Sequence, residues 1–164
     1  MHPTPSGTPG LDGTIDVRPG DRIPLVSPRV LRFNADWQPS GSWSFGGTVL
    51  AQAGSYARGN ENNSHQPDGV FFLAPGRSAG YAVLNLSARY RPTPRIQWFA
   101  HLDNVFDRHY SNAALLGETA FDAQGSFVAR PFPAVDGEFP LRSSTFFAPG
   151  APRTFLVGLR YTIE

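Results

Sequence analysis

The chain has 164 residues, enough for one ordinary domain, and a formal net charge of +1 at pH 7. This charge argues against a dedicated nucleic-acid binder, and the lack of cysteine excludes disulfide scaffolds, thiolate zinc sites and cysteine nucleophiles. With 17 glycines, 16 prolines and 13% aromatic residues, the composition favours strands and turns over helices.

The amino-terminal stretch MHPTPSGTPG contains neither a basic region nor an apolar region, so no signal peptide is expected in it. No run of apolar residues approaches the roughly 18 that a membrane-spanning helix requires. The regular elements expected further along the chain are strands.

Five segments alternate apolar and polar residues, which is the pattern of strands with two different faces. They lie at 30–38, 43–54, 81–90, 96–104 and 153–164. The apolar residues expected on one face are Leu31, Phe33, Ala35, Trp37, Trp43, Phe45, Val49, Ala51, Ala82, Leu84, Leu86, Ala88, Tyr90, Ile96, Trp98, Ala100, Leu102, Phe155, Val157, Leu159, Tyr161 and Ile163. We therefore expect an all-β fold.

The connections between these segments alternate in length. The first pair is joined by PSGS and the next by RPTPR, whereas residues 57–80 and 111–152 form long connections. Long loops count against a compact soluble domain but are normal on one side of an outer-membrane β-barrel. Trp37 and Trp43 flank one short turn, and Tyr90 and Trp98 flank the other, as in an interfacial girdle of aromatics. A soluble β-sandwich binding module would alternate in the same way and remains the alternative.

Three stretches resemble the carboxy-terminal strands of TonB-dependent outer-membrane receptors, and they occur in family order. They are GSYARGNENNSHQPDG, GYAVLNLSARYRPTPRIQWFAHLDNVFDRHY and FFAPGAPRTFLVGLRY. The resemblance implies an antiparallel meander of about five transmembrane strands, part of a barrel of about 22 strands. Residues 1–28 would be an extracellular loop remnant and strand lead-in, and residues 29–164 a barrel segment.

The resemblance also implies a function and a location. Such receptors lie in the outer membrane, contact its lipid and take up scarce ligands, typically ferric siderophores, with energy from the TonB complex acting on a plug domain. Neither the plug nor the TonB-contacting box is found here, and Ile163 and Glu164 stand where the family usually ends on an aromatic residue. We therefore expect a truncated receptor that contacts TonB only through the missing plug.

The stretch HLDNVFDRHY, residues 101–110, is the strongest candidate for chemistry. His101 and Asp103 are two apart on a strand and would point into the lumen together, where a polar lining is expected in any case. A small metal-dependent enzyme built on His101, Asp103, Asp107 and His109 is a remote alternative. The residues expected to face the lumen are Asn85, Arg89, His101, Asp103 and Arg160.

Residues 104–107 have the character of a strand end, because Asn and Asp favour local side-chain-to-backbone hydrogen bonds. No catalytic triad, phosphate-binding glycine loop or spaced carboxylate pair is found, so we expect no enzyme activity, no cofactor and no metal.

Contacts with an external ligand are expected from the first long loop, whose polar residues would suit a ferric chelate. The candidates are Arg58, Asn60, Glu61, Asn62, Asn63 and His65. The alternative is that these residues only stabilise turns. The second long loop carries six phenylalanines and should fold on itself or into the vestibule, because exposed aromatics promote aggregation. They are Phe121, Phe127, Phe132, Phe139, Phe146 and Phe147.

Overall fold

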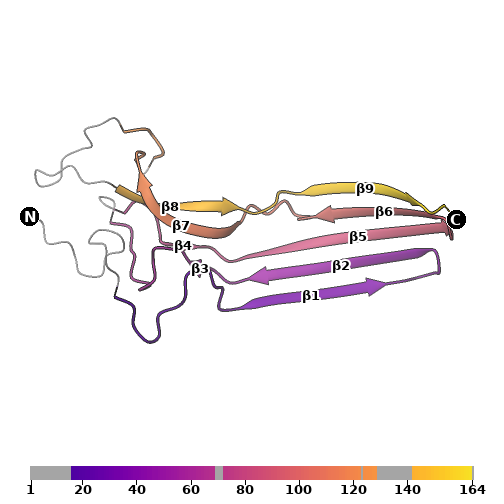
Figure 1. Ribbon diagram of the computed structural model, residues 1–164, viewed down its shortest axis with the longest axis horizontal. Coiled ribbons are helices and arrows are strands. Elements are labelled where there is room, and N and C mark those ends of the chain that lie inside the picture. The colour runs from indigo at the N-terminus through magenta and orange to yellow at the C-terminus, as the bar shows by residue number, and fades with distance from the viewer. Residues whose placement is uncertain (1–15, 69–71, 123, 129–141, 164) are drawn as a thin grey trace, which may run out of the picture. The chain divides into compact units, whose positions relative to one another are not determined.

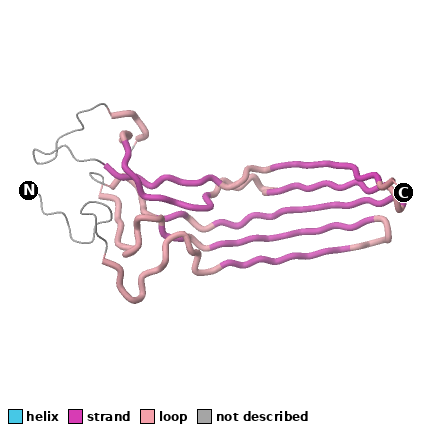
Figure 2. The backbone as a smooth tube through the Cα atoms, viewed as in Figure 1, coloured by secondary structure: helices cyan, strands magenta, loops and turns pink. Residues whose placement is uncertain are grey.

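The computed structural model describes residues 16–68, 72–122, 124–128 and 142–163, and all regular elements in these ranges are strands (Figures 1 and 2). The strands are β1 (Val30–Trp37), β2 (Trp43–Gln52), β3 (Ser55–Tyr56), β4 (Arg77–Ser78), β5 (Tyr81–Thr93), β6 (Ile96–Asp103), β7 (Ser111–Thr119), β8 (Arg142–Pro149) and β9 (Thr154–Tyr161). The chain divides into two compact units, which we call the sheet unit and the loop unit.

Across the described ranges, no helix is long and apolar enough to cross a membrane.

The sheet unit consists of residues 29–53, 80–110 and 149–164 and holds one five-stranded sheet. Its order is β1-β2-β5-β6-β9, and each strand is antiparallel to its neighbours. The strands run side by side in Figure 1, joined at one end by the two short turns. These five strands are the five expected from the sequence, and the predicted all-β meander is confirmed.

The register places the two kinds of side chain on opposite faces of the sheet. Leu86 is paired with Gly47 on one side and Leu102 on the other, while the next residue, Ser87, is paired with Gly46 and His101. Because side chains alternate along every strand, the first row lies on an apolar face and the second on a polar face. We use these two names below.

The apolar face is open. Leu31 is 62% exposed, Trp37 66% and Phe155 67%, and large apolar side chains of all five strands are similarly exposed. The buried apolar residues among those described are Ala57, Phe72, Val83 and Ala114, and only Val83 belongs to the sheet unit. The sheet therefore lacks the covered apolar core that a soluble β-sandwich requires.

Aromatic rings gather on the apolar face near the short turns. Trp43 stacks on Tyr90 with ring centroids 4.4 Å apart, and Phe45 lies between Trp43 and Trp37 at 5.5 and 5.6 Å. Tyr90 is in turn paired with Trp98. The expected alignment of aromatics at one level of the sheet is thus present across four strands.

A bulge interrupts the pairing of β5 with β6. The register shifts between Tyr90 and Thr93, so β5 continues three residues beyond its predicted end. Pro92 lies within this shift, where a residue without a backbone N–H is tolerated.

The described residues of the loop unit lie within 16–28, 54–79 and 111–148. It contains the pairs β3-β4 and β7-β8. The two long connections are bonded to each other, since the N–H of Arg58 donates to the carbonyl of Ala114 at 2.9 Å and the N–H of Leu73 to that of Ser143 at 2.9 Å. They form one structure, not two separate loops.

Candidate functional site

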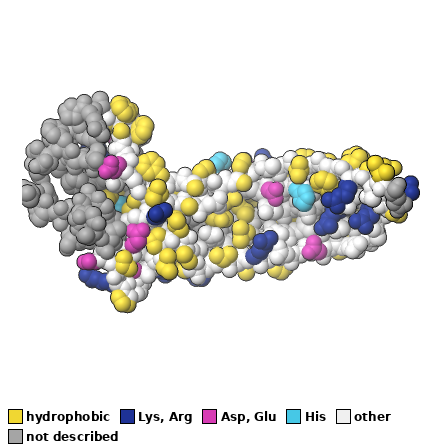
Figure 3. All heavy atoms as spheres, in the orientation of Figure 1, with side chains coloured by type: hydrophobic (Ala, Val, Ile, Leu, Met, Phe, Trp, Pro, Cys, Tyr) yellow, Lys and Arg dark blue, Asp and Glu magenta, His cyan; other side chains and the backbone are white. Residues whose placement is uncertain are grey.

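The polar face of the sheet brings together the residues expected to line a lumen. Asn85 is paired with Thr48, Arg89 with Ser44, and Gln97 with Arg160. Asn85, Arg89, His101, Asp103 and Arg160 therefore share one face, reached from β5, β6 and β9. In the space-filling view, acidic and histidine side chains lie along the middle of the sheet, with basic side chains gathered toward its turn end (Figure 3).

A hollow of about 360 Å³ lies on the polar face, with Gly46 in its floor. A Cβ at this position would lie 2.6 Å from Ser87 Oγ and 3.1 Å from Asp36 Oδ1, so glycine leaves room for these two side chains beside the strand. Thr48 donates to Asn34 Oδ1 at 2.9 Å on one wall. The polar lining side chains are Arg32, Asn34, Asp36, Thr48, Asn85, Ser87, His101 and Asp103.

This hollow suits hydrogen bonding more than metal chemistry or catalysis. His101 and Asp103 are both exposed, and within the described ranges no group of three His, Asp or Glu side chains is placed to hold a metal ion. Asp107, a member of the remote enzyme hypothesis, accepts a hydrogen bond from the Arg153 N–H at 3.0 Å instead. The arrangement offers hydrogen-bond donors and acceptors to polar or charged groups.

Asn104 closes the sheet at the end of β6. The side chain is 3% exposed, donates to the carbonyls of Arg108 and Ala151 at 2.9 and 3.0 Å, and accepts from the Arg108 N–H at 2.8 Å. Its φ is +48°, and its own N–H donates to Asn85 Oδ1 at 2.9 Å. Asn104 therefore ends β6 and holds the lead-in to β9, the kind of local bonding expected from residues 104–107.

Asn60 and His65 form the buried centre of the first long loop. Asn60 is 1% exposed; its amide donates to the Gly76 carbonyl at 2.8 Å and accepts from the His65 N–H at 3.1 Å. His65 Nε2 lies 2.9 Å from the carbonyl of Ala74, and its ring contacts Phe72 edge-on at 4.4 Å. Both side chains are thus engaged in holding the loop unit together.

The other residues expected to contact a ligand lie around this centre. Asn63 binds the backbone of Arg22 through its side chain and adopts a φ of +57°, while Asn62 accepts from the Ser64 N–H. Glu61 accepts from the Gly59 N–H through Oε1. Arg58 is exposed. Of the six, Arg58 is therefore the side chain most available to a ligand.

The phenylalanines of the second loop are only partly described. Phe121 and Phe127 meet edge to face at 6.1 Å, and Phe146 lies against Gly117. Phe132 and Phe139 lie outside the described residues. Phe121 and Phe127 contact each other, yet all four described phenylalanines of this loop are 47–70% exposed. The expected covering of these aromatics is therefore not observed among the described residues.

Sequence reasoning missed several residues of the polar face as site candidates. Arg32, Asp36 and Ser87 line the large hollow and could have been found by extending the same alternation to every strand. Gly46 gives no such signal, because a glycine has no side chain to mark a face. Arg91 was missed because it lies beyond residue 90, where the predicted strand ended.

Replacing Asn60 by alanine is expected to loosen the loop unit. The His65 N–H and the Gly76 carbonyl would lose their partner, at a cost of roughly 1–3 kcal/mol for each buried group left unsatisfied. Hydrogen exchange at the amides of residues 57–65 should accelerate, whereas exchange in β5 and β6 should not. Gln66→Ala, at an exposed position of the same loop, is the control; equal acceleration in both variants would contradict the role given to Asn60.

Comparison with known proteins agrees with this architecture. Among solved structures, the ferric-catecholate import receptor Fiu from E. coli is similar with a TM-score of 0.53 and 17% identity, over 84% of this chain and 14% of that one. The copper transporter OprC gives 0.50 and 24%, over 86% and 18%. The ferric citrate transporter FecA gives 0.50 and 18%, over 84% and 17%. The chain thus spans less than a fifth of the length of these structures.

No curated protein matches the chain at a significant level. The family model described as TonB dependent receptor-like, beta-barrel, matches residues 7–105, which is more than half of the chain. Members of this family are receptors of the outer membrane, and the five-stranded meander is a part of their barrel that does not close on itself. The chain belongs to the TonB-dependent receptor β-barrel family.

Proposed function

We propose that the chain forms part of the barrel wall of an outer-membrane receptor that takes up a scarce ligand, with a ferric siderophore as the ligand class. The observation that carries this proposal is the open apolar face, which extends over all five strands of the sheet. Lipid would cover this face, and no catalytic step is assigned. Relatives named as ferric-catecholate, ferric citrate and copper transporters support a metal-containing ligand.

The polar face would then line the lumen, with Asn85, Arg89, His101, Asp103 and Arg160 among its residues. The short turns of the sheet would lie on the periplasmic side. Coupling to the TonB complex would pass through a plug domain of the complete receptor. Within the first loop, Arg58 and Glu61 would contact the ligand, and Asn60, Asn62, Asn63 and His65 would shape that surface.

The membrane proposal requires further partners for the two outer strands of the sheet. Among the described strands, β1 pairs only with β2 and β9 only with β6. An unpaired strand edge is not tolerated in the hydrocarbon region, because its backbone groups have no water to bind. Further strands, from the complete receptor or another copy, would therefore pair with both edges.

Refolding the chain with and without mild detergent tests the proposal. We expect strand signal by circular dichroism in detergent and aggregation by sedimentation in plain buffer. A soluble monomer with a cooperative unfolding transition in plain buffer would contradict the membrane proposal and favour the β-sandwich module. Binding of a ferric catecholate or ferric citrate is then measured on protein folded in detergent, with Arg58→Gln as the variant and Arg142→Gln as its control.

A further inference from the structure

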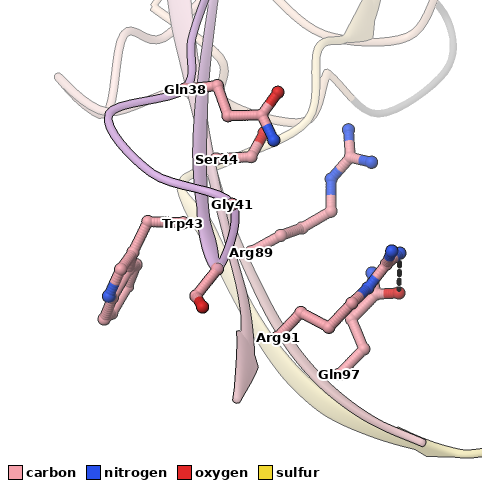
Figure 4. A pocket seen from close by; sticks show the side chains of 8 residues that line it. Gln38, Gly41, Trp43, Ser44, Arg89, Arg91 and Gln97 are labelled. Carbon is pink, nitrogen blue, oxygen red and sulfur yellow. Dashed lines mark hydrogen bonds between the residues drawn. The ribbon is translucent and has the colours of Figure 1, made fainter. Parts of the chain in front are cut away.

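We infer that a second hollow on the polar face, next to the short turns, is a binding site for a small oxyanion, a carboxylate or a phosphate. The hollow has a volume of about 170 Å³ and lies between β2, β5 and β6 (Figure 4). Its polar side chains are Gln38, Ser42, Ser44, Arg89, Arg91 and Gln97.

Two guanidinium groups converge on this hollow. Figure 4 shows Arg89 and Arg91 extending to the same side of the strands as Gln38 and Ser44, with the Trp43 ring on the opposite side. Residues i and i+2 of a strand share a face, which places Arg91 on the same face as Arg89. Arg91 donates to Gln97 Oε1 at 3.3 Å.

Among the described residues, arginine side chains gather at this end of the sheet. Arg160 adds a third cation, since it is paired with Gln97 on the neighbouring strand. No carboxylate of a described residue lines the hollow, and the Arg89 side chain makes no hydrogen bond or ion pair with a described residue. The acidic residues of the polar face, Asp36 and Asp103, line the other hollow. Like charges held side by side repel one another, and a bound anion would relieve that repulsion.

The lining side chains and the volume of the hollow indicate which class of ligand it would bind. Guanidinium groups bind carboxylates and phosphates through paired N–H donors, and the serine hydroxyls and glutamine amides nearby add neutral donors. Pockets for drug-sized ligands usually measure about 300–1,000 Å³, so a hollow of about 170 Å³ suits a single anionic group better than a whole chelate. The group is carried either by a free small anion or by an acidic protein side chain.

Arginine-selective NMR on the full chain in detergent micelles tests this site. The chain has no lysine, and its 14 basic residues are all arginine, so ¹⁵N-arginine labelling reports every basic side chain. At low salt, inorganic phosphate or a tetraglutamate peptide should shift the Arg89 and Arg91 guanidinium signals saturably. Arg89→Gln should weaken binding roughly tenfold, as expected for loss of a charge-assisted hydrogen bond, and Arg89→Lys by less.

Arg32→Gln is the matched control, because Arg32 lies on the same polar face in the other hollow. Unchanged tryptophan fluorescence would show that each variant keeps the sheet folded, since Trp37, Trp43 and Trp98 all belong to it. Tighter binding of the peptide would assign the oxyanion to a protein side chain, and tighter binding of phosphate to a free anion; either supports the site. Shifts that do not saturate, or equal weakening in Arg32→Gln and Arg89→Gln, would overturn it.

Discussion

Replacing Leu86 by arginine should lower the free energy of unfolding in lipid vesicles by about 2–4 kcal/mol, the cost of a cation near a bilayer midplane. Leu86 lies on the middle strand of the sheet and on its apolar face, paired with Gly47 and Leu102. Several rows of side chains separate it from the short turns, so an arginine there cannot easily reach the interface. Denaturant titration followed by tryptophan fluorescence measures the change.

Ser87→Arg is the matched control for this experiment, because it introduces the same charge one residue along the strand. Ser87 points to the polar face and lines the hollow of about 360 Å³ there. The lipid proposal therefore requires a much smaller loss for Ser87→Arg than for Leu86→Arg. Equal losses, or the full loss for Leu86→Arg in detergent-free buffer, would show that a protein core covers the apolar face.

Replacing Asn104 by alanine should lower the free energy of unfolding by roughly 2–4 kcal/mol, because buried backbone groups would lose their partners. Two carbonyls and one N–H now bind this side chain, at 2.8–3.0 Å. Alanine would also have to adopt a φ of +48°, which strains a residue with a Cβ. The same fluorescence titration applies.

Two further variants separate the causes of this loss. Asn104→Gly removes the hydrogen bonds but accepts the positive φ, so it should be less destabilising than the alanine variant. Phe106→Ala truncates a side chain of the same loop that is 77% exposed and should change stability little. A loss for Asn104→Ala no larger than that for Phe106→Ala would remove the structural role given to Asn104.

The sequence predicts the sheet well because its five strands have two chemically different faces. The alternation from Leu31 to Trp37, for example, predicts both the strand and which side chains lie on each face. The same alternation groups Asn85, Arg89, His101, Asp103 and Arg160, and the register places them on one face of the sheet. That this face lines a lumen stays a prediction. The alternation missed the extension of β5 to Thr93, because the bulge and Pro92 break the period of two.

The loop unit could not be predicted in the same way, because its structure depends on partners far away in the sequence. β3 and β4 are two residues each, too short to show any period. β8 begins with polar residues, and Ser143 finds its partner near Phe72, about 70 residues earlier. The polarity of Asn60 and His65 indicated exposure, yet both side chains are buried in the folded loop. There they bind the carbonyls of Gly76 and Ala74, partners that the local sequence does not reveal.

The bonding between the two long connections has a consequence for exchanging loops among receptors. A graft of residues 54–79 alone would lose the Ala114 and Ser143 carbonyls that accept from Arg58 and Leu73, and would expose Phe72. Thr145, which donates to the Pro75 carbonyl at 2.6 Å, would be separated from its acceptor as well. The smallest transferable element of this surface is therefore the pair of connections, and insertions in one should be accompanied by changes in the other.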